Sequence, residues 1–218
     1  MTKKARIERF YEELYDKFGP QGWWPAKTAL ECILGAILTQ NTSWSNVEKA
    51  LDNLMSQNLI SIERLDLITT DELAVLIRPS GYYNQKAVKI KKFVSFLLRE
   101  YSGSLDNMFA EDKSILREKL LSIQGIGPET ADSIMLYAGM IPVFVVDAYT
   151  WRILSRHGLV PIETSYDEIQ ELFTDSLRED AVMFNEYHAL LVKVGKEHCR
   201  KRNPLCGGCP LEFDPHEV

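Results

Sequence analysis

The chain has 218 residues, of which 45% are hydrophobic and 26% are charged, and its formal net charge is −6. This composition is typical of a globular protein with one large domain or two small lobes. It argues against a membrane protein, because no apolar stretch approaches the roughly 20 residues of a membrane span. The charged N-terminus resembles no signal peptide, so we expect a cytoplasmic protein.

Apolar residues recur with helical spacing along almost the whole chain, which predicts an all-α fold. The only strand-like run, residues 142–146, has no partner strand, and we interpret it as an extended connection. Ser165 and Glu168 have the spacing of a capping box at a helix start. The predicted helices, in chain order, cover residues 4–17, 28–39, 44–56, 71–77, 84–101, 113–122, 129–138, 148–156, 166–177 and 181–195.

Two clusters of cations stand out against the negative net charge. One consists of the lysines at 86–92, and the other lies within 193–202. Each cluster is either a binding surface for phosphates or a solvated face, and net charge does not decide between these, because affinity for nucleic acid depends on the local patch.

Two glycines separate the helix predicted at 113–122 from the one predicted at 129–138. Gly125 and Gly127 flank Ile126, and Pro128 suits the first position of a new helix. Glycine allows a positive φ and a close approach of another backbone, and we expect Ile126 to fill the gap between the two helices. The N–H groups at the start of the second helix suit one phosphate, although a plain helix–helix turn also explains the glycines.

A single acid, Asp147, follows the apolar run 143–146 and precedes a predicted helix. Behind a buried run this carboxylate is expected to be partly desolvated, where its electrostatic field is strongest. Aspartate is also a favoured N-cap for a helix that begins at Ala148, and both roles can hold together.

Three of the four cysteines lie close to the C-terminus, at Cys199, Cys206 and Cys209. In a cytoplasmic chain this crowding suggests a metal site rather than disulfides. Cys32 lies on an apolar predicted helix, and we expect it in the core.

Several blocks of the sequence, in this order, resemble the endonuclease III superfamily of helix-hairpin-helix DNA glycosylases. They are LGAILTQNTSW at 34–44, GYYNQKA at 81–87, IQGIGPETADSIMLYA at 123–138, VVDAYTWRI at 145–153 and Cys-x6-Cys-x2-Cys at 199–209.

The resemblance implies a two-lobed fold with a helical barrel over 27–138 that ends in the hairpin. Residues 1–26 and 139–218 are expected to form the second lobe. It further implies that double-stranded DNA with a damaged base lies in the central cleft, where the target nucleotide is flipped out of the duplex. We expect the protein to be a monomer.

The same resemblance assigns roles to single residues. Asp147 matches the catalytic carboxylate, which stabilises the oxocarbenium-like sugar or orients the attacking water when the N-glycosidic bond breaks. Gln40 matches the residue that enters the gap left by the flipped base. The other residues expected to contact DNA are Gly125, Ile126, Gly127, Glu129 and Thr130 of the hairpin, and Arg200, Lys201 and Arg202 of the cysteine loop, residues 199–209.

Glu129 departs from the pattern of those members that also cut the strand. They carry a lysine at this position, which attacks the sugar as a Schiff-base nucleophile. A carboxylate cannot form an imine, so the sequence predicts a monofunctional glycosylase without β-lyase activity. Glu129 is also explained as a first-turn acid that the helix dipole favours.

The stretch GWWP at 22–25 most resembles the 3-methyladenine branch of the superfamily, in which aromatic residues near the cleft stack on the flipped base. We therefore expect Trp23, Trp24, Pro25 and Tyr149 to line the base pocket, although large aromatic residues more often belong to the core. An N-alkylated adenine is cationic, so an aromatic face favours it and its weakened glycosidic bond needs no general acid.

The sequence leaves other functions open. Within enzymes, the alternatives are a mismatch-type thymine or uracil glycosylase and an endonuclease III-like enzyme. From another class, a non-catalytic helix-hairpin-helix module would bind DNA without chemistry, but it would have no reason to hold an acid at Asp147.

The superfamily's iron–sulfur loop has the spacing Cys-x6-Cys-x2-Cys-x5-Cys. Cys199, Cys206 and Cys209 match its first three ligands, and Pro215 occupies the fourth position. Either His216 or an outside ligand completes a 4Fe-4S cluster, or the cluster has been lost and the cysteines pack within the loop.

Overall fold

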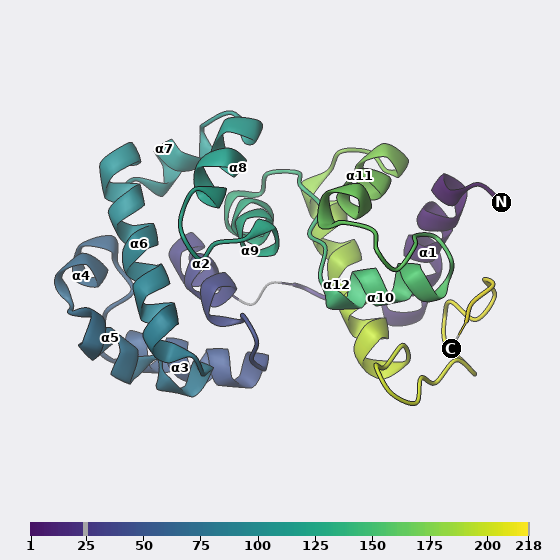
Figure 1. Ribbon diagram of the computed structural model, residues 1–218, viewed down its shortest axis with the longest axis horizontal. Helices are drawn as coiled ribbons and strands as arrows, with labels where there is room; N and C mark the ends of the chain where they lie inside the picture. Colours follow the sequence, from purple (N-terminus) through teal and green to yellow (C-terminus); the bar gives the residue numbers. More distant parts are fainter. Residues whose placement is uncertain (24–25, 218) are drawn as a thin grey trace. The chain divides into compact units, whose positions relative to one another are not determined.

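The computed structural model describes residues 1–23 and 26–217, and it confirms the all-α fold, because these residues contain helices and connecting loops but no β-strand (Figure 1). The chain divides into two compact units. We call Trp24–Ile141 the central unit and Met1–Trp23 with Pro142–Val218 the terminal unit. The central unit is three residues longer at each end than the expected barrel, 27–138. In the described ranges no helix has the length and apolarity that a bilayer requires.

The central unit is built around α2, whose residues from Leu30 to Leu38 are all buried. Helix α2 packs against α3, α6, α9 and η2, and α6 runs beside α4 and α5 (Figure 1). The elements of this unit are α2 (Ala29–Leu38), α3 (Trp44–Ser56), α4 (Ile62–Leu67), α5 (Thr70–Leu76), η1 (Arg78–Ser80), α6 (Tyr83–Tyr101), α7 (Leu105–Phe109), α8 (Lys113–Leu121), α9 (Pro128–Ser133) and the π-helical turn η2 (Ile134–Ala138).

The terminal unit joins the two ends of the chain. Helix α12 (Ala181–Glu197) packs against both α1 (Lys3–Phe18) and α10 (Ala148–Arg156), and α1 also contacts α11 (Tyr166–Ser176). Its core is aromatic: the ring of Phe144 stacks on that of Phe173 at 3.7 Å between centroids. The Tyr187 hydroxyl donates to the carbonyl oxygen of Ile7 at 2.8 Å, which ties α12 to α1.

The apolar run before Asp147 is an extended connection, as predicted. Its buried backbone finds partners on side chains of α11 instead of a sheet. The N–H of Val146 donates to the Tyr166 hydroxyl at 3.3 Å, and the Gln170 amide donates to the carbonyl oxygen of Phe144 at 2.6 Å. These bonds satisfy polar groups that would otherwise be buried without partners.

Two short helices, α4 and α7, were not predicted. They span six and five residues, too few for a helical period to show. The capping box at the start of α11 is confirmed, since Ser165 and Glu168 exchange both bonds. Cys32 is in the core as expected, and burial raises the pKa of its thiol to about 12.

Candidate functional site

The hairpin between α8 and α9 uses its two glycines differently. Gly125 has φ 96°, and a Cβ there would lie 2.8 Å from side-chain carbons of Lys89. Gly127 has φ −96° and is the N-cap of α9, so it does not use the positive φ that glycine allows. A Cβ on Gly127 would meet no protein atom within 4 Å. Ile126 is buried, as a residue that fills the gap between the two helices has to be.

An ion pair fixes the angle between the two hairpin helices. The guanidinium of Arg117, on α8, donates to both carboxylate oxygens of Asp132, on α9, at 2.8 and 3.1 Å. Asp132 is fully buried. Because a bidentate pair restrains both distance and orientation, the hairpin is presented as a rigid unit.

Gln40 connects the loop after α2 to the hairpin. Its side-chain amide donates to the Thr130 hydroxyl at 2.8 Å and to the carbonyl oxygen of Gly125 at 3.4 Å. Its oxygen accepts from the ammonium of Lys89. Residues from three separate segments of the sequence therefore meet at one place in the central unit.

The lysines at 86–92 do not act as one group, because they differ in burial and in hydrogen-bond partners. Lys86 is 2% exposed, and its ammonium donates to the carbonyl oxygens of Leu38 and Ser80 at 2.8 and 2.7 Å. Burial, with repulsion from Lys89, lowers the pKa of Lys86 to about 8. Lys91 binds carbonyl oxygens at the end of α4. Lys89 and Lys92 contact side chains at the hairpin, Gln40 and Gln124.

Asp147 lies at the start of α10 in the terminal unit and is its N-cap, as one of its two predicted roles requires. The oxygen Oδ1 accepts from the N–H of Thr150 at 2.8 Å and from the Thr150 hydroxyl at 3.0 Å. The other oxygen, Oδ2, lies 3.7 Å from Nε2 of His188 on α12. The Asp147 side chain is 13% exposed, so it is partly desolvated but still reachable.

Sequence reasoning missed His188 because it falls on the apolar face of α12, where a buried core histidine is the ordinary explanation. Burial lowers the pKa of His188, and the Asp147 carboxylate offsets only part of this shift. The imidazole is therefore neutral at pH 7.

Two of the expected base-pocket residues lie outside the described residues, namely Trp24 and Pro25. Trp23 is partly buried, with the ammonium of Lys196 5.9 Å from its ring centroid. Tyr149 is also partly exposed, and its ring packs directly on Gly195, where a Cβ would lie 2.5 Å from Tyr149 Cδ1. The base pocket itself stays a prediction.

The three C-terminal cysteines line one pocket. Three histidines line it as well, namely His157, His198 and His216. The residues do not fit a four-thiolate cluster, because Pro215 stands at the fourth position. Nor are any three His, Cys, Asp or Glu side chains arranged to hold a metal ion within 1–23 and 26–217.

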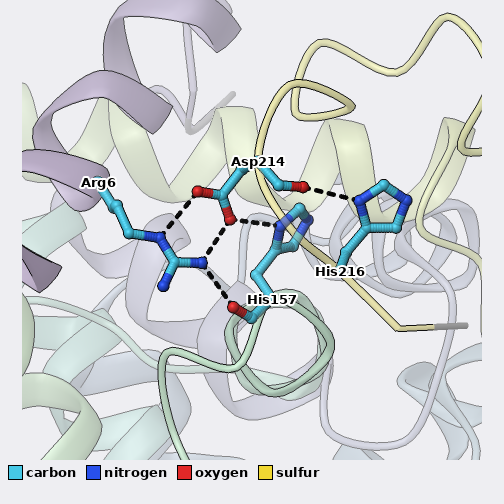
Figure 2. A network of polar contacts seen from close by, with 4 residues as sticks. All are labelled: Arg6, His157, Asp214 and His216. Atoms are coloured by element: carbon cyan, nitrogen blue, oxygen red, sulfur yellow. Dashed lines mark hydrogen bonds and ion pairs between the residues drawn. The ribbon is translucent and has the colours of Figure 1, made fainter. Parts of the chain in front are cut away.

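The C-terminal tail is anchored through Asp214 (Figure 2). Arg6, on α1, donates to both carboxylate oxygens at 2.8 and 2.5 Å, and His157 Nδ1 lies 2.9 Å from Oδ2. His216 Nδ1 lies 2.8 Å from the carbonyl oxygen of Asp214. Burial alone would raise the pKa of Asp214, but hydrogen bonds from Arg6 and His157 lower it on balance.

The cysteine loop presents its cations to solvent. Arg156, on α10, donates to the carbonyl oxygen of Arg200 at 2.8 Å and contacts Cys199 Sγ at 3.3 Å. The loop backbone is thereby tied to α10. The exposed cations on this loop are Arg200, Lys201 and Arg202.

Residues 34–179 match the family model described as "HhH-GPD superfamily base excision DNA repair protein". Over 213 residues the chain is 47% identical to a putative DNA repair glycosylase of Methanocaldococcus jannaschii, covering 97% of this chain and 96% of that protein. It is 29% identical over 184 residues to endonuclease III of Thermotoga maritima, covering 83% of this chain and 79% of that protein.

Solved structures show the same likeness. The fold matches an H. pylori 3-methyladenine DNA glycosylase bound to 1,N6-ethenoadenine with a TM-score of 0.76 and 31% identity, over 90% of this chain and 98% of that one. It matches a non-covalent endonuclease III–DNA complex with a TM-score of 0.84 over 99% and 96% of the two chains. At 22% identity the second match shows the fold alone.

Proposed function

Because the chain belongs to the HhH-GPD superfamily of base excision DNA repair proteins, we propose that it is a monofunctional DNA N-glycosylase for an alkylated purine such as 3-methyladenine. The observation that carries the proposal is the state of Asp147, a partly desolvated carboxylate with one oxygen fixed by Thr150 and the other beside a buried histidine. The 31% identity to a 3-methyladenine DNA glycosylase supports the choice of substrate.

The chemistry needs little beyond this carboxylate. When the bond between C1′ of the sugar and the purine nitrogen breaks, its electron pair leaves with the base. A 3-alkylated adenine is cationic while attached and departs neutral, so no general acid has to protonate it. The charge of Asp147 stabilises the oxocarbenium-like sugar, and the carboxylate can accept a proton from the water that adds to C1′.

The hairpin and the cysteine loop are the proposed contacts to the DNA backbone. In the hairpin, Gly125, Gly127 and Glu129 are exposed, and the open space beside Gly127 leaves room for a phosphate against the backbone. Such contacts grip a duplex without reading its sequence. Gln40 would have to exchange its bonds with Thr130 and Gly125 for contacts in the gap left by the flipped base.

The absence of lyase activity follows from Glu129. The structure adds that two lysines from α6 reach the hairpin, Lys89 and Lys92, so the chemical test must include them. Borohydride traps a Schiff base between enzyme and sugar, and we expect no trapped complex. A trapped complex that disappears on Lys89→Gln or Lys92→Gln would replace the monofunctional proposal by a lyase with a relocated nucleophile.

Base release tests the function directly. Duplex DNA that carries N-methylated purines is incubated with the wild type and with Asp147→Asn, and a duplex with a G·T or G·U mismatch is run alongside. We expect free 3-methyladenine, strand breaks only after alkali, and a loss of at least about 100-fold in rate for Asp147→Asn, with binding retained.

The other outcomes of this experiment are equally informative. Release of thymine or uracil would reassign the substrate to the mismatch class, and strand breaks without alkali would indicate an endonuclease III-like lyase. Equal behaviour of the wild type and Asp147→Asn, with binding but no release from any duplex, would favour a DNA-binding module.

No step of this proposal passes through an iron–sulfur cluster. The ligand set predicted from the sequence is tested by iron and sulfide analysis of protein purified without oxygen. About four irons per chain would require Cys199, Cys206, Cys209 and a fourth ligand such as His216 to converge. The proposal also includes a monomer that acts in the cytoplasm, and light scattering with and without duplex DNA tests the monomeric state.

A further inference from the structure

We propose that His188 is a positioning residue for Asp147, and that its ring N–H holds the carboxylate oxygen Oδ2 while leaving the carboxylate charged. The inference rests on the proposed glycosylase function of Asp147. It concerns only α10 and α12, two packed helices of the terminal unit.

The two oxygens of Asp147 have different partners. Oδ1 accepts twice from Thr150, once from the backbone N–H and once from the hydroxyl, and these bonds fix the N-cap. Oδ2 lies beside Nε2 of His188, at 3.7 Å. Both contacts from Thr150 are made to Oδ1. A contact at Oδ2 from α12 would restrain the carboxylate from its other side and limit the remaining motion of the side chain.

The packing of α12 brings His188 to this place. Gly195 lies seven residues, or two turns, after His188, and therefore on the same face of the helix. The missing Cβ at Gly195 lets the Tyr149 ring pack against the α12 backbone, and the Arg152 guanidinium donates to the Gly195 carbonyl oxygen at 3.2 Å. Two contacts from α10 thus hold the face of α12 that carries His188.

Histidine suits this position better than a permanent cation. A lysine or arginine beside Asp147 would neutralise much of the field that the proposed reaction needs. A buried imidazole stays neutral, because burial lowers its pKa, and it can still donate one N–H. The separation of 3.7 Å is longer than a hydrogen bond, and hydrogen bonds of catalytic groups commonly tighten only when substrate is bound.

The test compares His188→Leu with His188→Gln. Leucine keeps an apolar side chain of similar size, whereas the glutamine amide places an N–H donor near the position of Nε2. Single-turnover base release from N-methylated duplex and duplex affinity are measured for each. We expect His188→Leu to slow release at least tenfold and up to about 100-fold with unchanged affinity, because a 1 Å misplacement can cost that much. His188→Gln should restore most of the rate.

A matched control is His157→Gln, which removes another buried histidine of the same unit that contacts Asp214 rather than Asp147. It should lower Tm without changing the rate of the folded enzyme. Wild-type rates in both His188→Leu and His188→Gln would overturn the proposal. So would equal losses in the two variants accompanied by an equal fall in Tm, because that pattern is expected of a core residue.

A second measurement separates this inference from the proposed function. NMR titration of the His188 ring in the wild type and in Asp147→Asn detects the contact between the two side chains without a measurement of base release. We expect the pKa of His188 to fall further when the carboxylate is removed, since Asp147 raises it. An unchanged titration would refute the contact. An altered titration in a chain that releases no base would leave the contact standing but refute both the glycosylase function and the positioning role.

Discussion

Gly125 and Gly127 flank the same isoleucine, yet the fold needs a glycine only at Gly125. That residue has a positive φ, and its missing Cβ leaves space for the Lys89 side chain, which reaches Gln40. At Gly127 the backbone is extended and the space around it is open. A glycine that the fold does not require is consistent with close approach of a ligand, here the phosphate of the proposed DNA contact.

The two alanine variants separate these roles. We expect Gly125→Ala to lower the free energy of unfolding by about 1–2 kcal/mol, because an L-residue is strained at positive φ. Gly127→Ala should cost less than about 1 kcal/mol, the loss of a tolerated N-cap, but should weaken duplex binding. Urea unfolding and fluorescence anisotropy measure the two effects. Unchanged binding by folded Gly127→Ala would contradict the phosphate contact at this glycine.

At the scale of elements, the helices longer than eight residues were predictable because each carries an apolar face and most carry a capping residue. The hairpin and the cap at Asp147 were also predictable, because each is indicated by residues that are adjacent in the sequence. Contacts between distant segments were not. Lys86 was read as part of a charged cluster, although its spacing to Ile90 and Phe93 places it on the buried face of α6. His188 was missed because its partner is forty-one residues away.

The contacts of Arg6 and His157 with Asp214 predict how the C-terminal tail is held. We expect Arg6→Gln to lower the free energy of unfolding of the terminal unit by about 3–5 kcal/mol, because Asp214 is left as a buried charge without its main partner. Arg99→Gln, which breaks an exposed pair with Glu100, is the control and should cost less than about 1 kcal/mol. Urea unfolding and tail proteolysis give the readouts. If a chelator destabilised the tail and Arg6→Gln did not, a metal rather than this ion pair would be its anchor.

For the whole molecule, the proposed DNA substrate has to be reconciled with a net charge of −6. Salt screens the attraction between an exposed cation and a phosphate beyond about 10 Å. Exposed cations close to one another therefore matter more for DNA binding than the net charge of the whole chain. The loop at 199–202 meets this condition, because Arg156 ties its backbone to α10 while three adjacent cations stay exposed.

The salt dependence of binding distinguishes local from net charge. The variant with Arg200→Gln, Lys201→Gln and Arg202→Gln should bind duplex more weakly, and its slope of log affinity against log salt should shrink by about 0.9 for each cation that contacts a phosphate. The control replaces three exposed lysines of α1 by glutamine, Lys3, Lys4 and Lys17, which changes the net charge equally. Its slope should match the wild type. Equal changes in the two variants would mean that net charge, and not the cysteine loop, governs the affinity for DNA.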